Sequence, residues 1–162
     1  MPRFALEPVD STFFADAPQV FSETFEIALA APEVWAELVA DGALGFCRSL
    51  RGARWTSPRP FGVGTTRTMP GLYGALVIEE RFFRWEDGHR KSFYVERASL
   101  PLFRRFGEDY LLEETPTGCR LTWTIAAAPT LAGRLGSPLN SLVVTGMFKD
   151  VRRHFPAPRL PG

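Results

Sequence analysis

Cysteine and histidine are scarce in this sequence, and their scarcity excludes several kinds of site. The 162 residues include two cysteines, Cys47 and Cys119, and two histidines, His89 and His154. Zinc sites and nucleophilic triads draw on clustered Cys and His, whereas His89 falls in a turn and His154 among basic residues. We therefore expect no metal and no cofactor, and we interpret the two cysteines as buried, reduced thiols of a cytoplasmic protein.

An excess of one charge is also missing. Nineteen basic residues balance 18 acidic ones to a net charge of +1, so the chain has no field that would attract a nucleic acid. No uncharged apolar stretch reaches the roughly 20 residues that a membrane-spanning helix needs. Glu7 and Asp10 stand where a signal peptide requires an apolar segment. We expect no nucleic-acid partner and no integral membrane association, and either a monomer or a homodimer.

Aromatic residues, by contrast, are abundant. The chain has 14 Phe, 4 Trp and 3 Tyr, and rings of this size suit either a dense core or the wall of a cavity. A chain of this length fits one domain with one core. We predict an N-terminal arm over residues 1–19 that packs on the domain, a single domain over 20–156 and a C-terminal tail over 157–162.

The alternation of apolar residues and the turn signals predict an antiparallel α+β fold. A strand is expected from Val20 to Leu29, followed by a helix that opens at Pro32 and a second short helix from Ala43 to Leu50. The turns at 86–89 and 115–118 are typical of hairpins. Six further strands are expected over residues 53–56, 63–69, 75–85, 91–98, 106–113 and 119–127.

The last expected element is a long helix that begins at Ser137-Pro138, with Ser137 as its N-cap. Its first half is apolar on most sides, which predicts that it is buried on most sides. A short helical turn is expected before it, over residues 130–136. A curved sheet around one helix encloses more volume than the helix fills, so we expect a cavity.

Four segments carry a resemblance to a known family. They are Phe25–Trp35, with its Ala31-Pro32-Glu33-Val34-Trp35 motif, Gly62–Arg67, Glu80–Trp85, and Gly118–Trp123 before the closing helix. In this order the chain resembles the SRPBCC superfamily, also described as START-like or polyketide cyclase/dehydrase and lipid-transport-like, in an uncharacterised bacterial branch. The resemblance implies a helix-grip (START/Bet v 1-like) fold, with a curved antiparallel sheet of about seven strands around a long C-terminal helix and two short helices after the first strand. It also implies a ligand cavity.

Glu79 and Glu80 are adjacent, so they point to opposite faces of their strand. Both faces carry apolar residues, and the alternation therefore leaves open which carboxylate faces inward. The resemblance favours Glu80. An inward carboxylate has a raised pKa unless it is paired, which suits an acid, a base or a ligand anchor. A salt-bridged surface pair is the alternative.

Tyr94, on the next strand, is nominated with Glu80 for catalysis, because a phenol can donate a directional hydrogen bond to a ligand. A tyrosine of the core fits the pattern equally well. The loop at 101–103 is interpreted either as a lid or as a segment packed against the last helix. The residues expected to line the cavity are Arg67, Met69, Ile78, Glu80, Phe82, Tyr94, Glu108, Tyr110, Trp123, Asn140, Val144 and Phe148.

Three functions are compatible with these residues. The first is binding of a small hydrophobic or amphipathic molecule, lipid- or polyketide-like. The second is a cyclase, dehydratase or isomerase that uses Glu80 and Tyr94 on a polyketide-like substrate. The third is a ligand-free protein that binds a partner. A cavity under roughly 200 Å³, below the usual range of ligand pockets, would argue against the first two.

Overall fold

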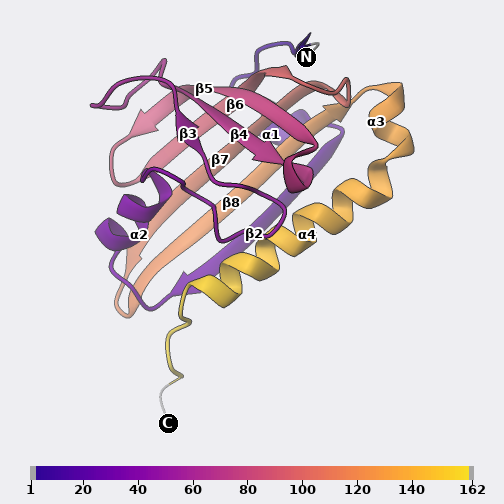
Figure 1. Cartoon of the computed structure of the whole chain (residues 1–162). Helices are drawn as coiled ribbons and strands as arrows, with labels where there is room; N and C mark the ends of the chain where they lie inside the picture. Colours follow the sequence, from indigo (N-terminus) through magenta and orange to yellow (C-terminus); the bar gives the residue numbers. More distant parts are fainter. Residues whose placement is uncertain (1–2, 161–162) are drawn as a thin grey trace.

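The computed structural model describes residues 3–160, in which one curved antiparallel sheet wraps around a long C-terminal helix (Figure 1). The helices are α1 (Phe13–Asp16), α2 (Ala31–Leu38), the short 3-10 turn η1 (Leu72–Gly74), α3 (Leu131–Leu135) and α4 (Ser137–His154). The strands are β1 (Phe4–Ala5), β2 (Gln19–Ile27), β3 (Arg54–Trp55), β4 (Thr66–Gly71), β5 (Leu76–Glu86), β6 (Arg90–Ala98), β7 (Phe103–Thr115) and β8 (Gly118–Pro129).

The strand order confirms the predicted helix-grip architecture. Strands β3 to β8 pair with their neighbours in sequence, and β2 pairs with β8 and forms one edge of the sheet. The seven expected strands are all present, and β1 adds a short eighth strand beside β6. Strand β7 begins earlier than predicted because Phe103 and Arg105 still pair with the end of β8.

The predicted second short helix over Ala43–Leu50 is wrong. The first helix is present as α2, with Pro32 in its first turn and the Glu33 carboxylate accepting the Ala30 N–H at 3.0 Å. The segment that follows α2 is a series of turns, because Gly42 and Leu44 have positive φ angles of 74° and 65°. A right-handed helix excludes such angles.

Helix α4 packs on the concave face of the sheet through one stripe only. Val144, Met147, Phe148 and Val151 are buried, and the Phe148 ring lies 5.5 Å from that of Trp123. The prediction that the first half is buried on most sides is wrong. Leu139 and Leu142 are 58% and 70% exposed, because the sheet covers only the inner side of the helix (Figure 1).

The start of α4 and the segment before it refine two further expectations. Gly136, not Ser137, is the N-cap residue of α4, and Ser137 is the first residue of the helix. The short helical turn before it is present as α3, whose Leu131 and Leu135 are 78% and 84% exposed. The apolar residues of α3 and of the first half of α4 thus form a continuous exposed stripe.

The N-terminal segment lies against the convex face of the sheet. Strand β1 pairs with the end of β6, and Phe13 of α1 forms a second buried cluster with Val9, Ala126 and Ala128. Residues 1–2 of the predicted arm and 161–162 of the predicted tail lie outside the described residues. Over residues 3–160, no helix combines the length and the apolar character that crossing a membrane requires.

Gly118, in the β7–β8 hairpin, has a backbone conformation that a side chain would disrupt. Its φ is 148°, and a Cβ there would lie 2.0 Å from the Ile27 carbonyl oxygen. We expect Gly118→Ala to lower the free energy of unfolding by about 2 kcal/mol, measured by urea denaturation. Gly146→Ala is the control, because a Cβ at this position of α4 meets no atom within 4 Å and alanine favours a helix. Equal effects of the two substitutions would contradict the prediction.

Candidate functional site

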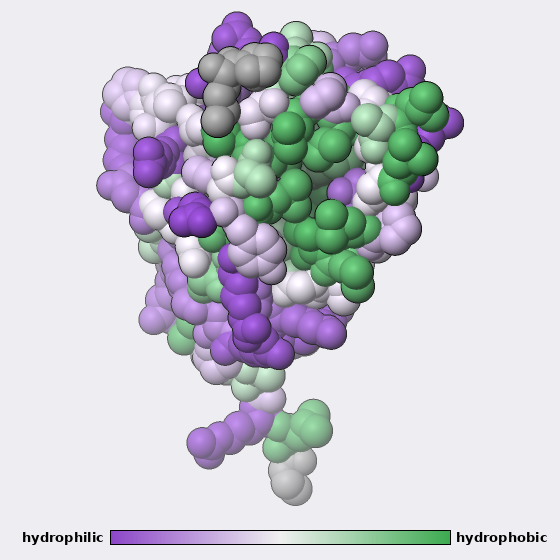
Figure 2. Space-filling view, turned by 45° about the vertical axis from the view of Figure 1, so that its right-hand side comes forward, coloured by the Kyte–Doolittle hydropathy of each residue, from purple (hydrophilic) through white to green (hydrophobic). Residues whose placement is uncertain are grey.

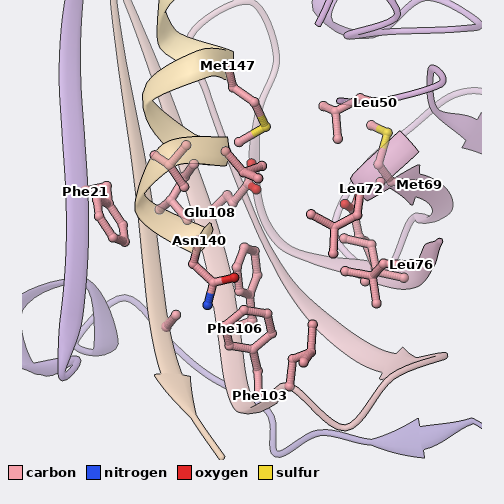
Figure 3. A pocket seen from close by; sticks show the side chains of 18 of the residues that line it. Phe21, Leu50, Met69, Leu72, Leu76, Phe103, Phe106, Glu108, Asn140 and Met147 are labelled. Atoms are coloured by element: carbon pink, nitrogen blue, oxygen red, sulfur yellow. The ribbon is translucent and has the colours of Figure 1, made fainter. Parts of the chain in front are cut away.

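A cavity lies between the concave face of the sheet and α4. Figure 3 shows Asn140 and Met147 of α4 on one side, Phe103, Phe106 and Glu108 of β7 behind them, and Leu50, Met69, Leu72 and Leu76 opposite. The remaining wall is mostly apolar and includes Phe21, Leu44, Ile78, Leu102, Ile125, Ala127, Val143 and Val144. Its polar members are Gln19, Arg67, Glu80, Glu108, Trp123 and Asn140.

The volume of this cavity is about 100 Å³, half of the value below which ligand binding and catalysis were both expected to fail. Liquid water occupies about 30 Å³ per molecule, so the space corresponds to roughly three waters. The expectation of a roomy cavity is therefore wrong for this conformation. Long, flexible side chains take up the room, above all Met69, Met147 and Leu72. A lipid-sized molecule enters only if these side chains or α4 move outward.

An ion pair between Arg67 and Glu80 forms one part of the polar wall. The Arg67 Nε donates to the Glu80 carboxylate, and the two side chains are 0% and 1% exposed. Burial raises the pKa of Glu80, although the Arg67 charge opposes the shift. Glu80 therefore faces inward, as the resemblance implied. Glu79 lies on the convex face, where it pairs with Arg3 and Arg97.

The Arg67 guanidinium has N–H donors that no acceptor uses among the described residues. Its Cζ lies 5.0 to 5.3 Å from the ring centres of Trp55, Phe82 and Phe93, which stabilises the cation but supplies no lone pair. Among the described residues, Nη1 and Nη2 have no hydrogen-bond partner although both atoms are buried. Asn140 Nδ2 and Gln19 Oε1 are buried without a partner as well.

Glu108 is the second inward carboxylate. Its Oε2 accepts hydrogen bonds from the Tyr110 hydroxyl at 2.6 Å and from Trp123 Nε1 at 2.8 Å. Burial, followed by the charge of Glu80, raises the pKa of Glu108 to about 7, while the two donors limit the shift. The carboxyl group is thus poised to take up or release a proton near neutral pH.

Lys91 completes this polar cluster and was not predicted, although it alternates along β6 with the inward residues Phe93 and Val95. Its Nζ is fully buried, donates to the Leu38 carbonyl at 3.1 Å and lies 4.5 Å from the centre of the Tyr110 ring. Burial, and then repulsion from Arg67, lowers its pKa well below the ordinary value. A lysine in a strand is usually exposed. Its place between the inward residues of β5 and β7 agrees with that alternation.

The shifted pKa of Glu108 predicts a pH dependence of stability. The unfolded chain releases this proton near pH 4.5, whereas the folded protein holds it until about pH 7. Between these values the folded state binds more protons, so stability falls as the pH rises. We expect the free energy of unfolding of the native protein to fall by about 2 kcal/mol relative to Glu108→Gln between pH 4.5 and 7.5. Urea denaturation across this range measures the difference, and parallel curves would contradict the prediction.

Of the twelve residues predicted for the cavity, eight line it, three lie directly behind the lining residues, and Tyr94 lies on the convex face of the sheet. Arg67, Met69, Ile78, Glu80, Glu108, Trp123, Asn140 and Val144 line it. Phe82, Tyr110 and Phe148 are buried behind the lining residues and contact them. Neither histidine is among the lining residues: His89 bonds to the Leu112 carbonyl and His154 stacks on Phe46. Cys47 and Cys119 are buried and unpaired.

The nomination of Tyr94 as a cavity residue is wrong. Tyr94 lies on the convex face, in contact with Phe83 and near Glu96. Its neighbours Phe93 and Val95 point inward, so alternation along β6 places Tyr94 outside. The loop at 101–103 contributes Leu102 and Phe103 to the cavity wall. The segment 44–50, predicted as helix, contributes Leu44 and Leu50, which the sequence analysis missed.

Comparison with known proteins agrees with this architecture. Residues 18–155 match the family model described as polyketide cyclase / dehydrase and lipid transport. Uncharacterised proteins from Mycobacterium tuberculosis and Mycobacterium bovis are 34% identical over 159 residues, which covers 93% of each chain.

Solved structures share the fold at low sequence identity. A START superfamily protein from Mycobacterium smegmatis superposes with a TM-score of 0.67 at 11% identity, over 84% of this chain and 96% of the other. Major latex-like protein 151 from Panax ginseng superposes with a TM-score of 0.62 at 16% identity, over 88% and 98%. By its sequence match and its helix-grip fold, the chain belongs to the polyketide cyclase / dehydrase and lipid transport family.

Proposed function

We propose that this protein binds a small hydrophobic or amphipathic molecule between the sheet and α4. The observation that carries the proposal is an apolar cavity with buried, unpartnered polar atoms in its wall. Apolar walls supply affinity at roughly 25 cal/mol per Å² of ligand surface buried. The polar atoms orient the ligand, since a buried donor without a partner favours a ligand that supplies one. Membership of the family supports the same function.

Binding requires the cavity to widen. The 100 Å³ space is bounded by Met69, Met147 and Leu72, whose unbranched or terminally branched side chains change rotamer at low cost. Helix α4 contacts the sheet through a single stripe, and its first half has an exposed outer side. An outward shift of this half enlarges the cavity without breaking a strand pair.

Mass spectrometry under native conditions, on protein purified from its source organism, tests the proposal directly. We expect a retained small molecule. In a second experiment, Val144→Phe places a ring in the cavity, and we expect at least a tenfold loss of affinity for an apolar fluorescent probe such as anilinonaphthalene sulfonate. Leu131→Phe is the control, because Leu131 of α3 is 78% exposed and does not line the cavity. No retained molecule and equal probe binding by both variants would favour a ligand-free, partner-binding protein.

Acid–base catalysis is a second candidate function, and Glu108 is the observation that favours it. Glu108 now replaces Tyr94 as the partner of Glu80 in this hypothesis, because it lines the cavity with a pKa of about 7. The test is incubation of the retained molecule with native protein and with Glu108→Gln. Conversion by the native protein alone supports catalysis, whereas an unchanged molecule in both samples argues for binding only.

A further inference from the structure

The most unusual group in the cavity wall is the Arg67 guanidinium. Its side chain is 0% exposed, its Nε is used by Glu80, and its Nη1 and Nη2 have no hydrogen-bond partner among the described residues. A buried donor that is left unpaired is destabilising, and more so when it is charged. The other face of the cation is covered by Trp55, Phe82 and Phe93. Arg67 is one of the residues around the cavity, and a ligand there would supply the missing acceptors once a neighbouring side chain moves aside to expose Nη1 and Nη2.

The geometry of these donors selects the kind of acceptor. A guanidinium presents its N–H groups as a planar fork, which matches the two oxygens of a carboxylate. The hydrogen-bonding capacity of the cluster favours an anion as well. Glu80 uses only the Nε of Arg67, and a ligand carboxylate would supply acceptors for Nη1 and Nη2, which have none among the described residues.

The shape of the cavity constrains the rest of the ligand. About 100 Å³ accommodates a carboxylate and little more, so the remainder extends past the lining side chains. Figure 2 shows hydrophobic side chains gathered around a hollow on the face that α4 borders. Leu139 and Leu142 of α4 and Tyr73 of η1 are 58–70% exposed beside a surface depression that shares Val143 with the cavity. The far side of this depression is charged and includes Arg48, Lys149, Asp150 and Arg153. A thin, flexible chain fits this path better than a rigid ring system.

We propose that the ligand is a straight-chain aliphatic carboxylic acid, whose carboxylate is bound by Nη1 and Nη2 of Arg67. This inference rests on the ligand-binding function proposed above. The alkyl chain runs between α4 and the β4–η1 segment toward the exposed leucines. Asn140 lies in the first turns of α4, and its amide is directed toward Phe106 (Figure 3). It is therefore placed along the chain and near the mouth.

The test compares two ligands that differ only in the end group. Dodecanoate and dodecanol are titrated into native protein at pH 7 and followed by isothermal calorimetry below their micelle or solubility limits. We expect dodecanoate to bind at least tenfold more tightly. Arg67→Lys keeps the charge and the partner of Glu80 but removes the fork, and we expect it to reduce this preference at least fivefold. Arg81→Lys is the matched control, because Arg81 pairs with Glu96 outside the cavity, and it should leave the preference unchanged.

The outcomes separate this inference from the proposed function. Equal binding of dodecanoate and dodecanol would overturn the inference and leave hydrophobic ligand binding intact. The native comparison decides this point even if Arg67→Lys fails to fold. A preference that is lost in Asn140→Leu but kept in Arg67→Lys would place the carboxylate at the mouth and also overturn it. Binding of neither ligand, together with no probe binding, would contradict both proposals.

Discussion

Replacing Arg67 by methionine is expected to lower the free energy of unfolding by about 3–5 kcal/mol, the usual cost of breaking a buried ion pair. Arg67→Met leaves the Glu80 carboxylate, 1% exposed, without its cation. The cost arises from the unpaired charge rather than from lost attraction, because both partners are desolvated in the native protein. Urea denaturation at pH 7 measures the change.

The double variant Arg67→Met/Glu80→Leu separates these two contributions. Both charges are then absent, and we expect the double variant to be about 2 kcal/mol more stable than Arg67→Met alone. Arg81→Met is the control, since Arg81 pairs with Glu96 on the convex face at 2.5 Å with 41% of its side chain exposed. Removing an exposed partner costs less than about 1 kcal/mol. A double variant no more stable than Arg67→Met would contradict the explanation that the unpaired Glu80 charge causes the loss.

Phe148→Ala is expected to destabilise the protein by about 3–5 kcal/mol, the range for removing a buried aromatic ring. Phe148 is the residue through which α4 contacts two strands: its ring lies 5.9 Å from that of Phe25 in β2 and 5.5 Å from that of Trp123 in β8. Truncation therefore loosens the helix as well as opening a void. Hydrogen exchange should show faster amide exchange along α4.

Leu142→Ala on the same helix provides the comparison for Phe148→Ala. Leu142 is 70% exposed, and a surface substitution of this kind changes stability by about 0.5 kcal/mol or less. The two substitutions remove apolar atoms from one helix and differ in burial. Similar effects on unfolding and on exchange would mean that α4 is held by contacts other than its inner stripe.

The fold was predictable from the sequence because its signals are local. The alternation in β2, the turns at 86–89 and 115–118, and Pro32 at the start of α2 each report on a few neighbouring residues. The segment after α2 was not predictable in this way. Its apolar residues fit a helical spacing, but Gly42 and Leu44 adopt positive φ angles that are stabilised by contacts with distant residues, such as the Gly42 N–H to the Ala53 carbonyl.

The polar groups of the cavity were predictable only in part. Glu108 and Trp123 were nominated by their place in alternating strands and Glu80 by the family resemblance, and all three line the cavity. Along β5 the side chains do not follow a strict inward–outward alternation, because the pairing of β5 with β6 shifts register after Glu79 and again after Phe82. The contacts of Lys91 and the unpartnered donors of Arg67 result from side chains that come together across β4, β5 and β6. These contacts join residues far apart in the sequence, so a local pattern does not predict them.

The burial of α4 was also predictable only in part. A helix that is apolar on most sides is usually enclosed on most sides. In this protein a single sheet covers only the inner stripe, and Leu139 and Leu142 remain exposed. Composition predicts that such residues seek an apolar environment. It does not predict whether the same chain provides that environment.

The pairing of β2 with β8 has a consequence for how the protein is made. Gln19 lies opposite Ala127 and Ile27 opposite Cys119, so β2 can pair with β8 only after the segment between them has been synthesised. At about 5–20 residues per second, this interval lasts seconds. During it, β2 is an unpaired edge with Phe21, Phe25 and Ile27 accessible to chaperones or to other nascent chains. The hairpins of β5 to β8 can form in the meantime, and β2 joins the edge of the sheet late in folding.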